Sequence, residues 1–390
     1  MRVSGVLAIS FFLVGCGTDD SQAIPGPDLS EEAALDGKAD SGGAGGLTNT
    51  SMLNGRQTNG RQTNGTEYAM TGADLGTLRM PVSAPATNAY PTVAGGSAVT
   101  GVHLTNGGIL TNAGVNFTRA RTTRTGTDLR NALVTGTMSD GKQATLWLKD
   151  IYPDPKNASR HLYNVMVYHR DPALVADPTS ECARTGRNCE RWDYACGTYP
   201  TTPNGRPFPV PALAVPGQWN FQSGAPGGGA KTVHIADGGN TRMTFACLNG
   251  AIGKCAYWGY EPWRSVAGQS LEPYHETCTR MVRLDYCGDG TSLTSTGVRI
   301  NVYDPLGVLT DTESWPFEST WNATGGHCGS GARRVCTVAS VDARGNAVCK
   351  EHSSDTALGY IRKHCPNQFV NAVSSSRCLN QPLITTEYAP

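Results

Sequence analysis

The sequence predicts an α+β fold that is predominantly β, with one central amphipathic helix and a disulfide-rich C-terminal half. Short runs of alternating or β-branched residues recur between Asp-Gly, Gly-Gly and Pro-containing turn sequences, as is typical of sheet strands. Only the segment at about 273–285 has strong helical periodicity. All but one of the 13 cysteines lie between residues 182 and 378.

Four segments are the best-defined strands, because their residues alternate in polarity or are β-branched and aromatic. They are residues 144–149, 162–168, 242–247 and 298–303. Two similar six-residue sequences, 104–109 and 110–115, follow each other and predict a hairpin pair.

The helix begins near Pro273, a residue favoured in a first helical turn, and Gly288 follows its end. At 100° per residue, one face is apolar and the other is polar. The apolar face carries Leu271, Tyr274, Cys278, Met281 and Val282, and the polar face carries Glu272, Glu276, Thr279, Arg280 and Arg283. The segment is therefore expected to be amphipathic.

Composition excludes one class of partner. The chain has 390 residues, with 32 Lys+Arg and 32 Asp+Glu, so its formal net charge is zero. A neutral chain offers no sign of a basic face for phosphates, and we expect no nucleic acid partner. At roughly 150 residues per domain, the length predicts two to three domains with a sizeable core.

The N-terminus predicts export. Arg2 precedes an apolar stretch, 6–14, that is too short to span a bilayer. The sequence Leu-Val-Gly-Cys at 13–16 resembles a bacterial lipobox, which implies cleavage before Cys16 and acylation of its thiol. An ordinary signal peptide is the alternative. Gly17 after the cysteine favours the outer membrane, by resemblance to known sorting behaviour.

The chain divides by composition. Residues after the signal are acidic and poor in large apolar side chains, which predicts disorder. An Asn-Gly repeat of period five follows at 54–68 and predicts turns. The expected units are a signal peptide 1–15, a lipidated tether 16–46, a turn-rich linker 47–100 and a body 101–390, with 101–235 and 236–390 as two candidate subdomains.

An even number of cysteines in an exported body indicates disulfides. The twelve are Cys182, Cys189, Cys196, Cys247, Cys255, Cys278, Cys287, Cys328, Cys336, Cys349, Cys365 and Cys378. Zinc is the alternative, but no Cys-x2-Cys pair occurs and the two His-Cys pairs lack ligand spacing. We expect no metal and no cofactor, and the sequence leaves the connectivity open.

Residues 278–290 read Cys-Thr-Arg-Met-Val-Arg-Leu-Asp-Tyr-Cys-Gly-Asp-Gly. Together with 244–255 and 258–263, this run resembles the ADYC-domain family, a group of exported bacterial proteins that are often lipoproteins. Leu284 stands where the family name has Ala, and repacking can absorb the larger side chain. The resemblance implies a fold unit and an exported location, and it implies no activity.

His275 and Asp285 are the candidate catalytic residues, because a His on a buried helix face can serve as a general base. They are about 15 Å apart along a helix axis, so they would not contact each other. The alternative is a core His and a core Asp that bond to backbone groups or to Arg. Asp285 and Asp289 lack the ligand spacing of a calcium loop. Residues 224–232 resemble a phosphate loop but depart from its pattern, which favours a flexible loop.

The aromatic cluster Tyr257, Trp258, Tyr260 and Trp263 is the candidate ligand surface, because flat rings stack on sugars or anchor a protein partner. A disulfide-framed core is its alternative. We therefore expect a membrane-anchored, exported lipoprotein with a non-catalytic binding or structural role at the cell envelope, where it binds an envelope protein or a saccharide. An exported hydrolase with a site at His275 or Asp285 is the alternative function.

Overall fold

The computed structural model describes most of the body. It covers residues 70–81, 90–99, 101–111, 129–138, 141–199, 208–220, 228–237, 241–294, 299–330, 336–341, 347–351, 359, 361–366, 370–371, 378 and 382–388. The predicted signal peptide, Cys16, the tether and the Asn-Gly repeat lie outside these residues. No helix within the described ranges has the length and apolar character to cross a membrane.

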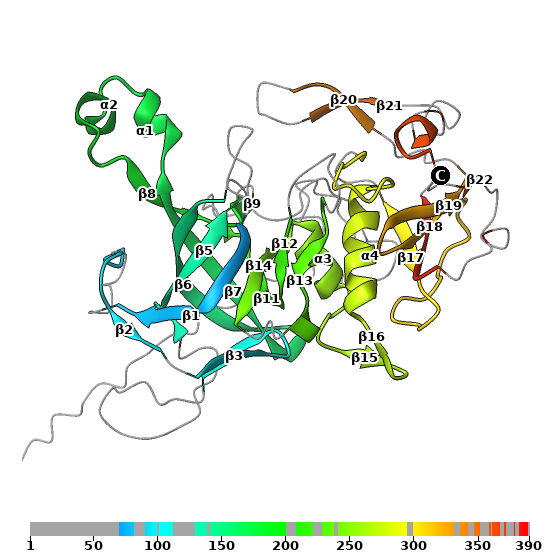
Figure 1. The fold of residues 1–390 in the computed structure, drawn as a ribbon, viewed down its shortest axis with the longest axis horizontal. Coiled ribbons are helices and arrows are strands. Elements are labelled where there is room, and N and C mark those ends of the chain that lie inside the picture. Colours follow the sequence, from blue (N-terminus) through cyan, green and yellow to red (C-terminus); the bar gives the residue numbers. More distant parts are fainter. Residues whose placement is uncertain are drawn as a thin grey trace, which may run out of the picture.

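Six antiparallel strands form a closed barrel (Figure 1). The strands are β1 (Met70–Met80), β5 (Leu133–Met138), β6 (Gln143–Asp154), β7 (Asn157–Arg170), β11 (Ala212–Pro216) and β14 (Arg242–Cys247). Their order is β11-β14-β1-β5-β6-β7, and β11 closes the ring by pairing with β7, with Ala212 opposite Tyr163.

Alternation along the barrel strands separates an inner from an outer face. Leu146 and Leu148 lie in the barrel core with Tyr163. Trp147, between them, belongs to a separate apolar cluster on the outer face with Met166. The inner and the outer face of these strands are therefore both apolar here, so other segments must pack over the outer face to keep it from water.

Two different segments cover the outer face. Helix α3 (Ala251–Tyr257) packs on the strip formed by β11 and β14, where Leu213 and Ala246 contact Ile252. The other strip is formed by Trp147, Met166 and Trp192, and Val93 packs against it. This second strip has no helix over it among the described residues.

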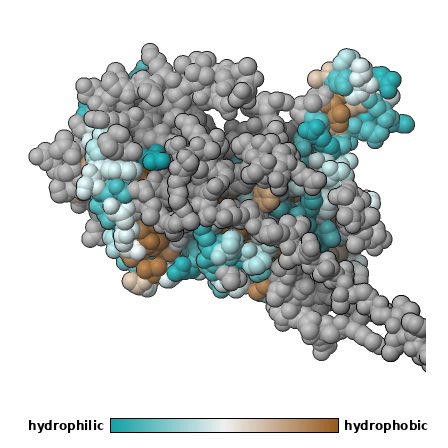
Figure 2. All heavy atoms as spheres, turned by 180° about the vertical axis from the view of Figure 1, so that it is seen from behind, coloured by the Kyte–Doolittle hydropathy of each residue, from teal (hydrophilic) through white to brown (hydrophobic). Residues whose placement is uncertain are grey.

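The long strand β7 also supports a projection. Its first half pairs with β11 and its second half pairs with β8 (Glu190–Tyr194). Between β7 and β8 the chain forms α1 (Pro172–Ala176) and α2 (Glu181–Thr185), with a disulfide from Cys182 to Cys189. Figures 1 and 2 show this finger standing away from the barrel, with a mainly hydrophilic surface.

Helix α4 (Glu272–Arg283) lies between α3 and a five-stranded sheet (Figure 1). The sheet has the order β17-β23-β18-β19-β22. Its strands are β17 (Ile300–Tyr303), β18 (Phe317–Asn322), β19 (Gly325–Gly329), β22 (Val370–Asn371) and β23 (Ile384–Tyr388). A second core forms here, with Met281 and Trp321 among its fully buried residues.

Short elements complete the described structure. They are β2 (Ser97–Ala98), β3 (Val102–Thr105), β4 (Gly108–Thr111), β9 (Thr198–Tyr199), β10 (Phe208–Pro209), β12 (Gln218–Trp219), β13 (Lys231–Val233), a 3-10 turn (Ile235–Asp237), β15 (Ser265–Val266), β16 (Gln269–Ser270), β20 (Cys336–Val341) and β21 (Ala347–Glu351).

The predicted fold class is confirmed: the protein is mostly β with few short helices. Each of the four predicted strands overlaps a strand of the structure, and 242–247 coincides with β14. The predicted hairpin is present as β3 and β4, joined by Asn106 and Gly107, both at positive φ. Most of its second six-residue repeat lies outside the described residues.

Three expectations need correction. β1 lies inside the segment predicted as linker, yet it pairs with β14 and β5 in the barrel. The predicted helix 273–285 ends two residues early, at Arg283, because Leu284 adopts a left-handed conformation. The division at 235/236 separates β14 from the barrel to which it belongs, so the change of core lies beyond Cys247.

Five disulfides join ten of the twelve predicted cysteines. The bridges are Cys182–Cys189, Cys196–Cys247, Cys255–Cys278, Cys287–Cys365 and Cys328–Cys378. The side chains of Cys336 and Cys349 lie outside the described part of the structure. So many bridges indicate an extracytoplasmic protein, because the cytosol keeps thiols reduced.

Candidate functional site

His275 lies in the interior between α4 and α3. The residue is 0% exposed, and its Nε2 is 2.9 Å from the carbonyl oxygen of Ile252. Because a carbonyl only accepts, Nε2 carries the proton and donates. The ring meets Trp219 edge to face at 5.7 Å. Burial, together with the nearby charge of Lys231, lowers the pKa of His275 to about 3. His275 is therefore a neutral core residue.

Asp285 lies just beyond the end of α4. The backbone N–H groups of Leu284 and Asp285 bond to the carbonyls of Met281 and Arg280, which closes the helix as a Schellman motif. Leu284 takes the left-handed position, with φ 51°, that glycine usually occupies. The chain thereby turns sharply and brings the carboxylate of Asp285 back toward the helix.

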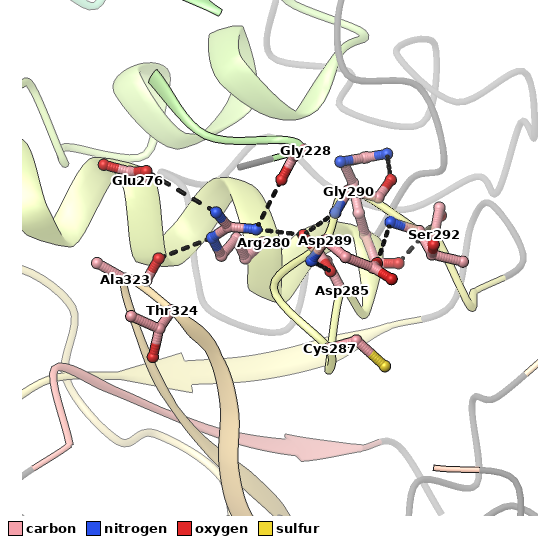
Figure 3. Close-up of polar contacts among 12 residues, drawn as sticks. Gly228, Glu276, Arg280, Asp285, Cys287, Asp289, Gly290, Ser292, Ala323 and Thr324 are labelled. Atoms are coloured by element: carbon pink, nitrogen blue, oxygen red, sulfur yellow. Dashed lines mark hydrogen bonds and ion pairs between the residues drawn. The ribbon is translucent and has the colours of Figure 1, made fainter. Parts of the chain in front are cut away.

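The Asp285 carboxylate is fully bonded within the protein (Figure 3). It accepts from Nη1 of Arg280 and from the backbone N–H groups of Asp289 and Gly290, both at 3.1 Å. Nε of Arg280 donates in turn to the carbonyl of Ala323, at 2.7 Å. Burial raises the pKa of Asp285, and the nearby arginines oppose that shift. This arrangement matches the alternative of a core Asp that bonds to Arg and to backbone groups.

The next residues of the signature join this turn to the sheet. Tyr286 packs against Trp321 of β18, with ring centroids 4.6 Å apart. Cys287 is bridged to Cys365. Gly288 faces the backbone of Thr324, between β18 and β19. The signature residues therefore form a corner that fastens α4 to the five-stranded sheet.

The polar face of α4 is also buried, contrary to a simple amphipathic helix. Glu276 and Arg280 are at most 8% exposed, and Glu272 bonds to Nζ of Lys231 at 3.0 Å. Lys231 belongs to β13, which contacts this face, so the predicted flexible loop ends in a strand whose first residue is buried. Residues 224–227 of that loop lie outside the described residues.

The predicted aromatic ligand surface is not at the surface. Tyr257, Trp258 and Tyr260 are buried, and Tyr260 donates to Asp304 at 3.0 Å. Trp263 is half-buried and contacts the turn of the β3–β4 hairpin at Gly107. Three of these rings are core residues and Trp263 packs at the edge of a core cluster, which favours the alternative that the sequence left open.

An open groove lies on the outer barrel strip that has no helix over it. Its volume is about 490 Å³. The lining residues are Tyr90, Tyr168, Glu190, Arg191, Trp192 and Asp193. Tyr90 is 60% exposed, and among the described residues only one other large hydrophobic side chain, Val175, is classed as exposed.

Three aromatic rings, those of Tyr90, Tyr168 and Trp192, line this groove. Tyr90 lies nearly parallel to Trp192, with an interplanar angle of 12° and centroids 6.5 Å apart. Trp192 contacts Tyr168 at 5.2 Å and meets Trp147 edge to face at 5.8 Å. Since Tyr168 is directly opposite Trp192 in the β7–β8 ladder, the sheet fixes these two rings.

Charged groups line the rim of the groove in opposite pairs. Asp193 accepts from Nε of Arg191 at 2.9 Å and contacts Nε2 of His169 at 3.0 Å. Arg191 also pairs with Asp171 at 2.8 Å. The hydrogen bond to Asp193 raises the pKa of His169, and the same bond lowers the pKa of Asp193.

The sequence alone indicates only part of this groove. Residues 190–194 read Glu-Arg-Trp-Asp-Tyr, in which polar and aromatic residues alternate as on a half-exposed strand. Tyr90 is far away in the sequence, inside the segment predicted as linker. Only the barrel topology brings the two segments together.

No three His, Cys, Asp or Glu side chains of the described residues lie close enough to hold a metal ion. No curated protein and no solved structure matches the chain. The family model of the ADYC domain matches residues 126–335, over half of the 390 residues, and this match includes the corner at 284–288 and strand β8. The chain therefore belongs to the ADYC-domain family.

Proposed function

We propose that the protein is an exported lipoprotein, anchored through an acylated Cys16, with a non-catalytic binding role at the cell envelope. The lipobox-like sequence at 13–16 supports the anchor, and Gly17 supports the outer membrane. One acyl chain anchors only marginally, so stable attachment needs a second chain on the same cysteine. The acidic segment after it serves as a tether that holds the disulfide-stapled body away from the bilayer.

The observation that carries the binding role is the groove at Tyr90 and Trp192. An exposed aromatic ring beside paired donors and acceptors is the usual composition of a recognition surface. A general base, in contrast, must reach the proton that it abstracts. His275 is enclosed and bonded to Ile252, and Asp285 is bonded to Arg280, so nothing favours a hydrolase at these residues.

The anchor is tested by Cys16→Ser. Cells that express the wild-type chain should incorporate an alkyne-labelled fatty acid into the protein, and Cys16→Ser should abolish the label and leave an unprocessed or mislocalised precursor. Ser21→Ala, five residues further on, is the control that should keep the label. A Cys16→Ser protein that is still processed and membrane-bound would contradict the anchor. Density separation of inner and outer membranes then tests the location.

A further inference from the structure

The groove presents one exposed aromatic ring, Tyr90, stacked on a buried one, Trp192. Trp192 is held from below by Trp147 and Tyr168, whereas Tyr90 remains 60% exposed at the opening. A ligand that covered the Tyr90 ring would gain the free energy of burying its apolar surface. A pyranose ring has an apolar C–H face that stacks on such a ring and hydroxyl groups at its edge.

The charges of the groove argue against an ionic ligand. Arg191 lies between Asp171 and Asp193, so its charge is compensated on both sides. A cation is already present at the aromatic cluster, because Nζ of Lys149 lies over the rings of Trp147 and Tyr194. In the groove itself, a cationic ligand would meet Arg191, and an anionic ligand would meet Glu190 and Asp193.

The same rim suits hydroxyl groups. Carboxylates accept, a guanidinium donates, and a hydroxyl does both. Glu190, Arg191 and Asp193 therefore offer acceptors and a donor within one short strand. Backbone pairing with β7 holds that strand in place, which pre-organises the rim before a ligand arrives. A volume of about 490 Å³ falls within the roughly 300–1,000 Å³ of small-molecule sites.

From these observations we infer that the groove of Tyr90, Tyr168 and Trp192, with its rim of Glu190, Arg191 and Asp193, binds a neutral saccharide. This inference rests on the proposed binding role and names its ligand class. Tyr90 supplies the stacking face, Trp192 supports that ring from behind, and the rim bonds to hydroxyls. Because the groove is open to solvent, it accepts a stretch of an oligosaccharide chain.

The test uses the full-length protein purified in detergent. Cellohexaose, chitohexaose, maltohexaose and xylohexaose are titrated separately, with tryptophan fluorescence as the readout and isothermal calorimetry as a second measurement. At least one hexasaccharide should bind with a Kd between about 10 µM and 1 mM, the weak affinity expected of an open site. Tyr90→Ala should weaken that binding at least tenfold, and Tyr90→Phe should keep it, because the phenyl ring still stacks.

Val175→Ala is the matched control, since Val175 is also exposed but lies on the finger outside the groove. It should bind like the wild type. Melting curves of Tyr90→Ala should match the wild type, which separates lost binding from lost folding. No binding by any of the four sugars, or binding that Tyr90→Ala leaves unchanged, overturns the inference. Tetramethylammonium or phosphate that binds in a Tyr90-dependent way, where the sugars do not, also overturns it. Fatty-acid labelling at Cys16 is read separately, so these failures leave the anchor standing.

Discussion

Asp285 accepts a hydrogen bond from the guanidinium of Arg280, and both side chains are buried at the end of α4. A buried ion pair contributes little over a well-packed apolar pair, but removal of one partner leaves an unpaired charge in the interior. Asp285 also receives two backbone N–H groups from the loop that follows. The pair is therefore the centre of the corner that joins α4 to the sheet.

Replacement of this carboxylate should destabilise the fold strongly. Asp285→Ala removes the nearest anion of the buried Arg280, which keeps only Glu276 at 4.0 Å, and leaves two backbone donors without an acceptor. We therefore expect a loss of about 3–5 kcal/mol in the free energy of unfolding. Urea unfolding followed by tryptophan fluorescence measures it. Asp289→Ala is the control, because its carboxylate accepts from the N–H of Thr291, two residues away in the same loop. A smaller loss for Asp285→Ala than for Asp289→Ala would contradict this role.

The sequence predicted the fold best where local pattern and tertiary role agree. Residues 242–247 alternate in polarity and form one strand of the barrel wall, so β14 was predicted with its observed bounds. β1 was missed because its glycines are typical of turns. At position 72 a Cβ atom would lie 2.4 Å from the side chain of Gln218, so a glycine fits there. This contact involves a segment that is distant in the sequence.

Helix α3 was missed for a similar reason. It has only seven residues and carries Gly253, which lowers helical propensity. That glycine lets the helix approach the backbone of Cys247 on β14, where a Cβ atom would come within 2.2 Å. The groove was out of reach of sequence reasoning, because Tyr90 and Trp192 meet only once the barrel has formed. The predicted aromatic cluster does not form a ligand surface. Aromatic residues that are close in the sequence can be either exposed or buried, and the sequence does not show which elements pack over them.

Gly288 should tolerate no side chain. Its φ is 64°, and a Cβ atom there would lie 1.8 Å from the carbonyl oxygen of Thr324. Gly307 has nearly the same φ, 69°, with nothing within 4 Å, so it isolates the backbone strain. Gly307→Ala should cost about 1–2 kcal/mol of stability, the usual penalty of the left-handed region. Gly288→Ala should cost at least about 2 kcal/mol more, from the steric overlap.

Chemical denaturation of the two alanine variants beside the wild type measures this difference. Equal losses for Gly288→Ala and Gly307→Ala would mean that the corner at Thr324 has room to move. Both variants should keep saccharide binding under native conditions, because neither glycine lines the groove.

The mature body should contain no free thiol. Ten cysteines are bridged, and an even number of cysteines in an exported body predicts that the other two, Cys336 and Cys349, are paired as well. We expect these two to form a sixth bridge. Thiol titration of the exported protein, denatured without reductant, should give no signal, and peptide mapping should recover a fragment that joins Cys336 to Cys349. Two reactive thiols per chain would contradict the pairing and reopen the metal interpretation.

His275 should make stability depend on pH in a predictable direction. Its pKa in the fold is about 3, whereas the ordinary value of 6.5 applies to the unfolded chain. The unfolded chain therefore binds one more proton between these values, and stability falls as the pH drops through that window. Between pH 7.5 and 5, this one group should remove about 2 kcal/mol from the free energy of unfolding.

The measurement compares urea unfolding of the wild type and His275→Gln at pH 7.5 and pH 5. Glutamine keeps a donor toward the carbonyl of Ile252 and has no charge to gain, so the variant should lose about 2 kcal/mol less than the wild type over this range. His275→Ala, which also leaves a void and removes the bond, should be less stable by about 1–3 kcal/mol at pH 7.5. Parallel pH profiles for wild type and His275→Gln would show that the buried ring titrates normally. A His275→Ala protein that keeps its stability but loses an activity against hydrolase substrates would instead make His275 catalytic. Catalytic side chains often lower the stability of the fold that holds them, so their removal need not destabilise it.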